Sequence, residues 1–286
     1  MLRTLYTLIG LLFTSCLYAQ TLEEDRVALV ALYTATNGDN WDNNTGWSVP
    51  GSSGDNPCGW YGITCNNTND RVTEINFDNN HFQGSLPAEI GNLTALTKLN
   101  MTGGSNGIYT ETLLNGILPT ELGNLVELEY LQLGKNHFSG QLPESLGNLI
   151  KLKTLDLNYV PFDVGFDRIG ELNGGIPSSF QNLKNLEYLD LSRQNLDGAI
   201  PSFVGDFVKL THLNLSDNQF SGSVPTSFNN LVNLTLLNLS YYDLYLPNRE
   251  AYGKLKLLPD LTALPTSATI DVSGNSFIFD GIESNV

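Results

Sequence analysis

The sequence has few of the residues on which catalytic and metal centres are usually built. It contains three histidines and three cysteines among 286 residues. It lacks the Gly-rich phosphate-loop, His-Glu-x-x-His and paired Cys-x-x-Cys motifs. His81 and His137 both stand in the tripeptide NHF, so we expect them at equivalent places in two repeats and not around one metal ion. We therefore predict no cofactor, no metal site, no catalytic residues and no enzymatic activity.

Positive charge is also scarce. The chain has 14 Lys and Arg residues against 30 Asp and Glu residues, which gives a formal net charge of −16. A protein this acidic repels nucleic acid and anionic membranes, so neither is an expected partner. General solvation of an exported surface is sufficient to explain the charge, and we expect a monomer.

Long hydrophobic runs are missing except at the start of the chain. One Arg precedes an apolar run from Leu5 to Phe13, and Ala19 supplies a small residue before Gln20. This layout predicts a signal peptide over residues 1–19, cleaved near Ala19. An alternative is a lipoprotein with an acylated Cys16. No later apolar run approaches the ~18 residues of a membrane span, so we expect a secreted or cell-surface protein.

Removal of the signal peptide leaves two cysteines, Cys58 and Cys65. An even pair of cysteines in an exported protein indicates a disulfide and not a metal site.

The most prominent feature of the sequence is an internal repeat of the form L-x-x-L-x-L. Successive copies are separated by 24, 32, 24, 34, 24, 24 and 33 residues. The base unit is therefore 24 residues long, and three units carry extra lengths of 8, 10 and 9 residues. The eight copies begin at Val72, Leu96, Leu128, Leu152, Leu186, Leu210, Leu234 and Ser267. A fixed period of this kind predicts a stack of coils.

One plain unit, Leu210 to Asn233, illustrates the pattern. Its sequence is LTHLNLSDNQFSGSVPTSFNNLVN. Leu213 and Leu215 alternate with polar residues and should point inward from a short strand. The side chain of Asn218 can bond to the turning backbone and to the adjacent coil, and Phe228 should be buried on the return leg. A single unit cannot bury these residues, so the units must stack into one continuous core.

The pattern L-x-x-L-x-L-x-x-N-x-F-S-G-x-x-P resembles the plant-type leucine-rich repeat, and the resemblance covers roughly residues 21–279. That family includes receptor ectodomains, polygalacturonase inhibitors and exported bacterial proteins. The resemblance implies an α/β fold, a right-handed leucine-rich repeat solenoid (horseshoe) with a concave parallel β-sheet and a convex side of 3₁₀ turns and loops. The Gly-x-(Ile/Leu/Val)-Pro segments usually support a second, lateral sheet.

Both ends of such a stack need caps. Residues 20–70 are similar to the N-terminal cap of the family, with the spacing Cys-x-Trp-x-Gly-Ile-x-Cys from Cys58 to Cys65. We expect an amphipathic helix there that buries Val27, Leu29, Val30 and Leu32. Residues 71–286 then form about eight coils. After Val272 only 14 residues remain, and they either form a makeshift cap or mark the chain as a fragment.

The three longer units place their insertions near residues 102–113, 158–171 and 240–260. The first two lie between the strand and the Gly-x-x-Pro turn, and the third is expected to replace that turn. All three should emerge along one edge of the concave sheet. They are rich in aromatic residues, which favours a recognition surface. The alternative is that these aromatic residues pack against the flank of the solenoid.

Candidate ligand-binding residues lie on the concave strands and at this edge. They are Tyr130, Asp156, Tyr159, Tyr188, Asp190, Arg193, His212 and Tyr241. Asp156 and Asp190 occupy equivalent positions of neighbouring strands and should lie roughly 5 Å apart. A retaining glycosidase uses two carboxyls at about that distance. The same column is filled by Asn or Asp in most coils, however, so we interpret the pair as part of the repeat.

These observations predict a non-enzymatic exported protein that binds a protein, peptide or glycan through its concave face and inserted loops. One alternative is an inhibitor or adhesin similar to the polygalacturonase inhibitors. More remote alternatives are a glycan hydrolase and an ice-binding protein with a flat, regular outer surface.

Overall fold

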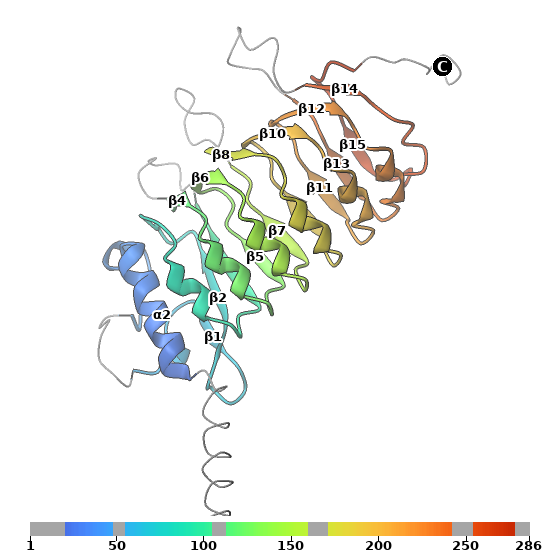
Figure 1. The fold of residues 1–286 in the computed structure, drawn as a ribbon. Helices are drawn as coiled ribbons and strands as arrows, with labels where there is room; N and C mark the ends of the chain where they lie inside the picture. Colours follow the sequence, from blue (N-terminus) through green and yellow to red (C-terminus); the bar gives the residue numbers. More distant parts are fainter. Residues whose placement is uncertain (1–20, 48–54, 105–112, 160–170, 242–253, 278–286) are drawn as a thin grey trace, which may run out of the picture.

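The computed structural model describes residues 21–47, 55–104, 113–159, 171–241 and 254–277. Two parallel sheets and a row of 3₁₀ turns run side by side along a stack of coils (Figure 1). The expected solenoid is thereby confirmed. The predicted signal peptide and the central parts of the three insertions lie outside the described residues. None of the helices in the described part of the chain has the length and hydrophobicity of a bilayer span.

The main sheet, which we call the concave sheet, has nine strands and receives one strand from every coil. Its coil strands are parallel and in register, so that Leu155 pairs with Leu189 and Leu189 pairs with Leu213. Only β1, from the cap, runs antiparallel to its neighbour β2. The strands are β1 (Ile63–Cys65), β2 (Val72–Asp78), β3 (Lys98–Thr102), β5 (Tyr130–Gln132), β7 (Thr154–Asp156), β9 (Tyr188–Asp190), β11 (His212–Asn214), β13 (Leu236–Asn238) and β15 (Thr269–Asp271).

The second sheet, which we call the lateral sheet, has six parallel strands. They are β4 (Asn115–Ile117), β6 (His137–Gln141), β8 (Glu171–Gly174), β10 (Asn195–Ala199), β12 (Gln219–Ser223) and β14 (Leu255–Leu257). The Gly of each Gly-x-x-Pro segment has a left-handed backbone, as at Gly198 with φ 76°, which explains the choice of residue. In the coil with the third insertion, near residues 240–260, the lateral strand is β14, which pairs with β12.

Short 3₁₀ turns form the side opposite the concave sheet. In six of the described coils the proline of the Gly-x-x-Pro segment is the residue that precedes the turn. The turns in the coils are η3 (Ala88–Asn92), η4 (Thr120–Asn124), η5 (Glu144–Asn148), η6 (Ser178–Asn182), η7 (Ser202–Asp206) and η8 (Thr226–Asn230), and the cap adds η1 (Gly38–Asn40) and η2 (Pro57–Gly59). Between turns and sheets, repeated Leu and Phe residues form one continuous core, in which Leu213 and Phe228 are fully buried.

The N-terminal cap begins with the helix α2 (Leu22–Ala35), which packs against η3 of the first coil. Thr21 and Glu24 form a reciprocal capping box at its start, which satisfies free backbone N–H groups. The helix buries Leu29 and Leu32 as predicted. The expectation for Val27 is wrong, because its side chain is 51% exposed.

An ion pair that the sequence did not predict connects the helix α2 to the first coil. The carboxylate of Asp25 is fully buried and accepts hydrogen bonds from Arg71 Nε at 3.1 Å and from the backbone N–H of Val72 at 2.7 Å. Nothing in the helical pattern of the sequence distinguishes this acid from its exposed neighbours Glu23 and Glu24.

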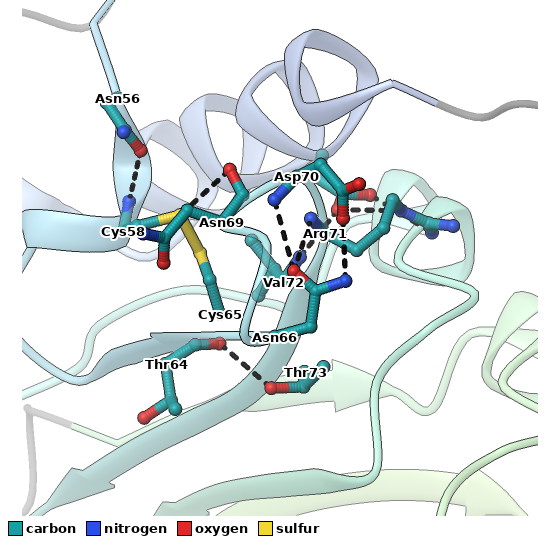
Figure 2. The surroundings of a disulfide bond; sticks show 11 residues. Asn56, Cys58, Thr64, Cys65, Asn66, Asn69, Asp70, Arg71, Val72 and Thr73 are labelled. Carbon is teal, nitrogen blue, oxygen red and sulfur yellow. Dashed lines mark hydrogen bonds and ion pairs between the residues drawn. A yellow bond between two sulfur atoms is a disulfide. The ribbon is translucent and has the colours of Figure 1, made fainter.

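The rest of the cap is held by the predicted disulfide and an aromatic cluster. Cys58 and Cys65 are bonded, and a turn closed by Asn66 and Asp70 lies beside them (Figure 2). The rings of Trp41, Trp47, Trp60 and Phe77 pack at centroid distances between 4.7 and 5.7 Å. The three tryptophans are buried, so they serve the core of the cap.

A row of buried amide side chains connects consecutive coils, and we call it the amide ladder. Asn218 Nδ2 donates to Leu191 O of the preceding coil at 2.8 Å and to Leu215 O of its own coil at 3.1 Å. Its Oδ1 accepts from the backbone N–H of Leu196 at 3.1 Å, again in the preceding coil. Corresponding bonds to the preceding coil are made by Asn136, Gln194 and Asn275.

The C-terminal end of the stack consists of β14 and β15, each the last strand of its sheet. Ile270 is 40% exposed and Leu257 is 44% exposed, so the last coil is less covered than the central ones. Phe277 is half-buried against the core, in agreement with the first part of the expected makeshift cap. The other residues of that expectation, 278–286, lie outside the described residues.

Replacement of a ladder amide should weaken the whole stack. Asn218→Ala leaves the N–H of Leu196 and the C=O of Leu191 buried without their side-chain partner, so we expect the free energy of unfolding to fall by about 2–4 kcal/mol. Chemical denaturation measures this change. The matched control is Asn148→Ala in η5, where the side chain is exposed, and its effect should be within about 0.5 kcal/mol. Equal effects of the two variants would contradict the structural role of the ladder.

Candidate functional site

The outward residues of the concave sheet form two rows that cross the strands. The first row contains Glu74 of β2 and the first residue of each later strand of the concave sheet. Because the register is parallel, equivalent residues of adjacent coils lie side by side. The first row reads Glu74, Lys98, Tyr130, Thr154, Tyr188, His212, Leu236 and Thr269. The aromatic residues are confined to the middle of this row. Tyr130 is 38% exposed, and Tyr188 and His212 are half-buried.

Tyr188 and His212 form a stacked pair. Their ring centroids are 4.2 Å apart and their planes differ by 14°. Burial raises the pKa of the Tyr188 hydroxyl, and the carboxylates of Asp190 and Asp156 raise it further. Burial lowers the pKa of His212, although Asp190 opposes this effect. The pair is therefore an uncharged aromatic surface at neutral pH, with carboxylates next to it.

The second row contains the outward residue two positions after each residue of the first row and is mainly structural. Most of its side chains accept a hydrogen bond from the backbone two residues later, as when Asp190 Oδ1 accepts from the N–H of Ser192 at 2.9 Å. Some also bond to one another, as when Asn214 Nδ2 donates to Asp190 Oδ2 at 3.1 Å. The row reads Asn76, Asn100, Gln132, Asp156, Asp190, Asn214, Asn238 and Asp271. The interpretation of the column as part of the repeat is consistent with these bonds.

Asp156 and Asp190 pair across neighbouring strands as predicted, but their environments differ. Asp190 is 5% exposed, both of its oxygens accept hydrogen bonds, and its Oδ2 lies 4.0 Å from His212 Nε2. Asp156 is half-buried, and Oδ1 accepts only from the N–H of Asn158 at 3.1 Å within the described residues. A buried, fully bonded carboxylate is poorly placed to act as a nucleophile.

Burial raises the pKa of the Asp156 carboxyl from 3.8 to about 6. The negative charge of Asp190 acts in the same direction, while the N–H of Asn158 and the ammonium of Lys135 act against it. Asp156 therefore carries an unfavourable charge in the middle of the concave sheet. Among the described residues no three His, Cys, Asp or Glu side chains are arranged to hold a metal ion.

The remaining candidates lie at the edge of the concave sheet, just after the strands. Arg193 is exposed and its Nε lies 3.5 Å from Asp217 Oδ2. Tyr241 is half-buried, with Lys254 Nζ 5.4 Å above the centre of its ring. Tyr159 is 5% exposed and lies against His137 with 5.8 Å between ring centroids. Tyr159 thus packs on the flank, which was the alternative for the aromatic residues of the insertions.

The structure therefore separates the eight candidates into two groups. Asp156, Tyr188, Asp190 and His212 are in contact or on adjacent strands, with Tyr130 two coils away from Tyr188 in the same row. The edge residues Tyr159, Arg193 and Tyr241 point to different partners. Phe162 and Phe166, which belong to the second insertion, lie outside the described residues.

Comparison with known proteins supports the interpretation of the coils. Residues 22–66 match the leucine rich repeat N-terminal domain, and residues 71–93, 127–149, 185–207 and 209–231 match the Leucine Rich Repeat. A probable leucine-rich repeat receptor-like protein kinase of Arabidopsis thaliana is 42% identical over 103 residues, which cover 35% of this chain and 10% of the relative. A probable inactive kinase of the same type and organism is 34% identical over 83 residues, covering 29% and 12%.

Solved structures with the same fold include the PEPR1–AtPEP1 complex, at 30% identity and a TM-score of 0.68, over 89% of this chain and 32% of that one. This chain is a plant-type leucine-rich repeat protein with an N-terminal cap. A plant ice-binding protein is similar at 26% identity and a TM-score of 0.65, over 89% of this chain and 79% of that one. The chain spans about a tenth of the length of the curated kinases and about a third of the PEPR1 chain.

The leucine-rich repeat coils that match the family are the short ones. The matched segments 71–93, 127–149, 185–207 and 209–231 contain no insertion. The three coils that carry insertions lie between or after them, with concave strands β3, β7 and β13. These insertions are consequently the part of this leucine-rich repeat protein that departs most from the common pattern.

The raised pKa of Asp156 predicts a pH-dependent stability. Its folded pKa of about 6 lies above the unfolded value near 3.8, so the folded state binds more protons between these values and stability falls as pH rises from about 4 to 6. Asp156→Asn removes this charge and restores the asparagine found in the same row at Asn214. We expect the variant to have a higher Tm than wild type at pH 7 and a smaller difference at pH 4. A difference that is unchanged between these two pH values would refute the assignment.

Proposed function

We propose that this chain is an exported or cell-surface binding protein that holds an extended peptide across the middle of its concave sheet. The observation that carries the proposal is the confinement of Tyr130, Tyr188 and His212 to the central coils of the first row. Tyrosine combines a large contact area with a polar group, and it is enriched at the centres of binding surfaces. The row lies on the side of the sheet away from the core, where Tyr130 is exposed and Tyr188 and His212 are half-buried.

The size of this surface fits a short peptide. Four adjacent strands, β5, β7, β9 and β11, span about 14 Å at a strand spacing of about 4.8 Å. An extended chain advances about 3.3 Å per residue, so about four or five ligand residues cross these strands. A row of side chains from parallel strands therefore offers one contact surface per coil to such a ligand.

The similar structures support a binding role. PEPR1 was solved with AtPEP1, and the ectodomain of the receptor kinase GASSHO1/SCHENGEN3 from Arabidopsis thaliana was solved in complex with Casparian strip integrity factor 2. The latter is 26% identical with a TM-score of 0.58 over 88% of this chain and 32% of that one. Secretion or surface exposure of this chain agrees with the predicted signal peptide and the disulfide.

A library of random peptides displayed on phage tests this function. We expect selection of peptides on the immobilised protein, and Tyr130→Ala with Tyr188→Ala should weaken their binding at least about tenfold, because central aromatic residues commonly contribute about 2 kcal/mol or more each. The matched control replaces Val126 and Ile150, which are 46% and 55% exposed beside the 3₁₀ turns, with Ser. Binding that is lost in the control and kept in the tyrosine variant would show that the concave face is the wrong surface.

Ice binding is a second candidate because of the lateral sheet. Beside the Gly-x-x-Pro turns, ten exposed or half-exposed residues occupy two equivalent repeat positions in five coils, and Asp197 is the one charged residue among these ten. The first position reads Asn115, Ser139, Asn173, Asp197 and Ser221, and the second reads Ile117, Gln141, Gly175, Ala199 and Ser223. Mostly uncharged side chains that recur in every coil suit an ordered water lattice. The similarity to a plant ice-binding protein over most of both chains supports this candidate.

Ice recrystallisation and thermal hysteresis measurements distinguish this candidate. If the lateral sheet binds ice, Ala199→Lys in β10 should abolish the effect, since one bulky charge interrupts this surface. The control Thr154→Lys places the same charge on the concave sheet and should leave the effect unchanged. Absence of any inhibition of ice growth by the wild-type chain would rule out this candidate and leave peptide binding unaffected.

A further inference from the structure

The centre of the concave sheet contains an acidic group that forms no ion pair with any of the described residues. Within the described residues, Asp156 takes part in no ion pair, and its only hydrogen bond comes from the backbone of Asn158. The ammonium of Lys135 acts on Asp156 electrostatically but forms no ion pair with it within the described residues, and two further basic side chains are paired with other carboxylates. Lys153 Nζ lies 2.6 Å from Glu129 Oε2, and Arg193 Nε lies 3.5 Å from Asp217 Oδ2. An unpaired, half-buried carboxylate is unfavourable unless something else supplies the opposite charge.

Acceptor atoms near Asp156 also lack donors. The Oδ1 atom of Asn158 is buried and accepts no hydrogen bond from the described residues. Other coils have a hydroxyl at the position of Asn158 that donates to the second row, as Ser216 Oγ does to Asn214 Oδ1 at 2.8 Å and Ser240 Oγ does to Asn238 Oδ1 at 2.7 Å. Asn158 supplies no such donor to Asp156. The site is therefore rich in acceptors and poor in donors.

The coil that precedes Asp156 has no side chain at the position next to its carboxylate. Gly134 occupies the corresponding position of the preceding coil, and a Cβ built on it would lie 2.8 Å from Asp156 Oδ1 and 3.0 Å from Asn158 Oδ1. Both acceptor oxygens thus lie over the backbone of Gly134, where a larger residue would push them away. The glycine is the reason that the two oxygens can lie together at this place.

An aromatic surface lies beside the carboxylates. The stacked rings of Tyr188 and His212 belong to the two coils that follow Asp156. His212 Nε2 is buried and has no hydrogen-bond partner among the described residues. Aromatic faces attract cations through their quadrupole, and the attraction adds to that of a nearby carboxylate.

We propose that the concave sheet recognises a basic side chain, Lys or Arg, of its peptide ligand, with Asp156 as the partner of the cation and the Tyr188–His212 pair as the adjacent aromatic surface. This inference rests on the proposed peptide-binding function and specifies the ligand chemistry. A ligand ammonium or guanidinium supplies the donors and the positive charge that the site lacks. A charge-assisted bond of this kind is stronger than a neutral one.

Peptides selected from the random phage library provide the test. We expect them to share one Lys or Arg position, and replacement of that residue by norleucine should weaken binding by about tenfold or more. In Asp156→Asn the Lys and norleucine forms of the peptide should bind equally, because the partner of the cation is gone. Asp156→Asn keeps the size of the side chain and matches the asparagines in the same row.

Two further variants separate the local effect from the overall charge. Asp197→Asn removes the same charge from the exposed lateral sheet and should keep the full preference for Lys. Gly134→Ser should reduce the preference at least threefold by displacing the acceptor oxygens, and near-unchanged Tm values would show that both variants remain folded. A Lys preference that is the same in wild type and Asp156→Asn overturns the inference.

The outcomes also distinguish the two proposals. Selected peptides without a basic position, whose binding still depends on Tyr130 and Tyr188, would refute the basic-side-chain inference and leave the proposed peptide binding in place. Failure to select any peptide would refute both.

Discussion

The amide ladder is the interaction on which the rest of this solenoid depends. Each ladder residue satisfies a backbone carbonyl and a backbone N–H of the coil before it, as Asn218 does for Leu191 and Leu196. The carbonyl follows the concave strand, as Leu191 follows β9, and the N–H lies at the start of the lateral strand, as Leu196 does in β10. Because buried backbone groups must be paired, the ladder allows a sharp corner in every coil.

The ladder also explains where insertions are tolerated. The three coils with insertions have Gly104, Val160 and Tyr242 at the ladder position in place of an amide. The backbone carbonyls at the corners of these three coils accept hydrogen bonds from the amide of the following coil. Asn136 donates to Met101 O, Gln194 donates to Leu157 O and Asn275 donates to Leu239 O. Each long coil is followed by one that retains the amide. An insertion can therefore begin at the corner without leaving buried groups of its own coil unpaired, and it emerges between the concave and lateral strands.

Much of this structure follows from the period of the sequence. The 24-residue unit predicts the concave strands, their parallel register and the two rows of outward residues, because one coil repeats the environment of the next. Contacts that break the repeat were not predictable. Asp25 is buried by an arginine 46 positions away, and Tyr159 packs on a histidine of the previous coil. The unpaired state of Asp156 depends on Asn158 and Gly134 together, and neither residue alone distinguishes it from the other acids of its row.

The parallel register has a further consequence for the shape of a ligand. Tyr130 and Tyr188 lie two coils apart in the same row, which corresponds to about 9.6 Å at a strand spacing of about 4.8 Å. A polyproline II helix repeats every three residues, or about 9.3 Å. A ligand in that conformation, lying across the strands, presents the same side of its chain to every second coil. Every third ligand residue would then meet a tyrosine, while the residues between them face Thr154 and the solvent.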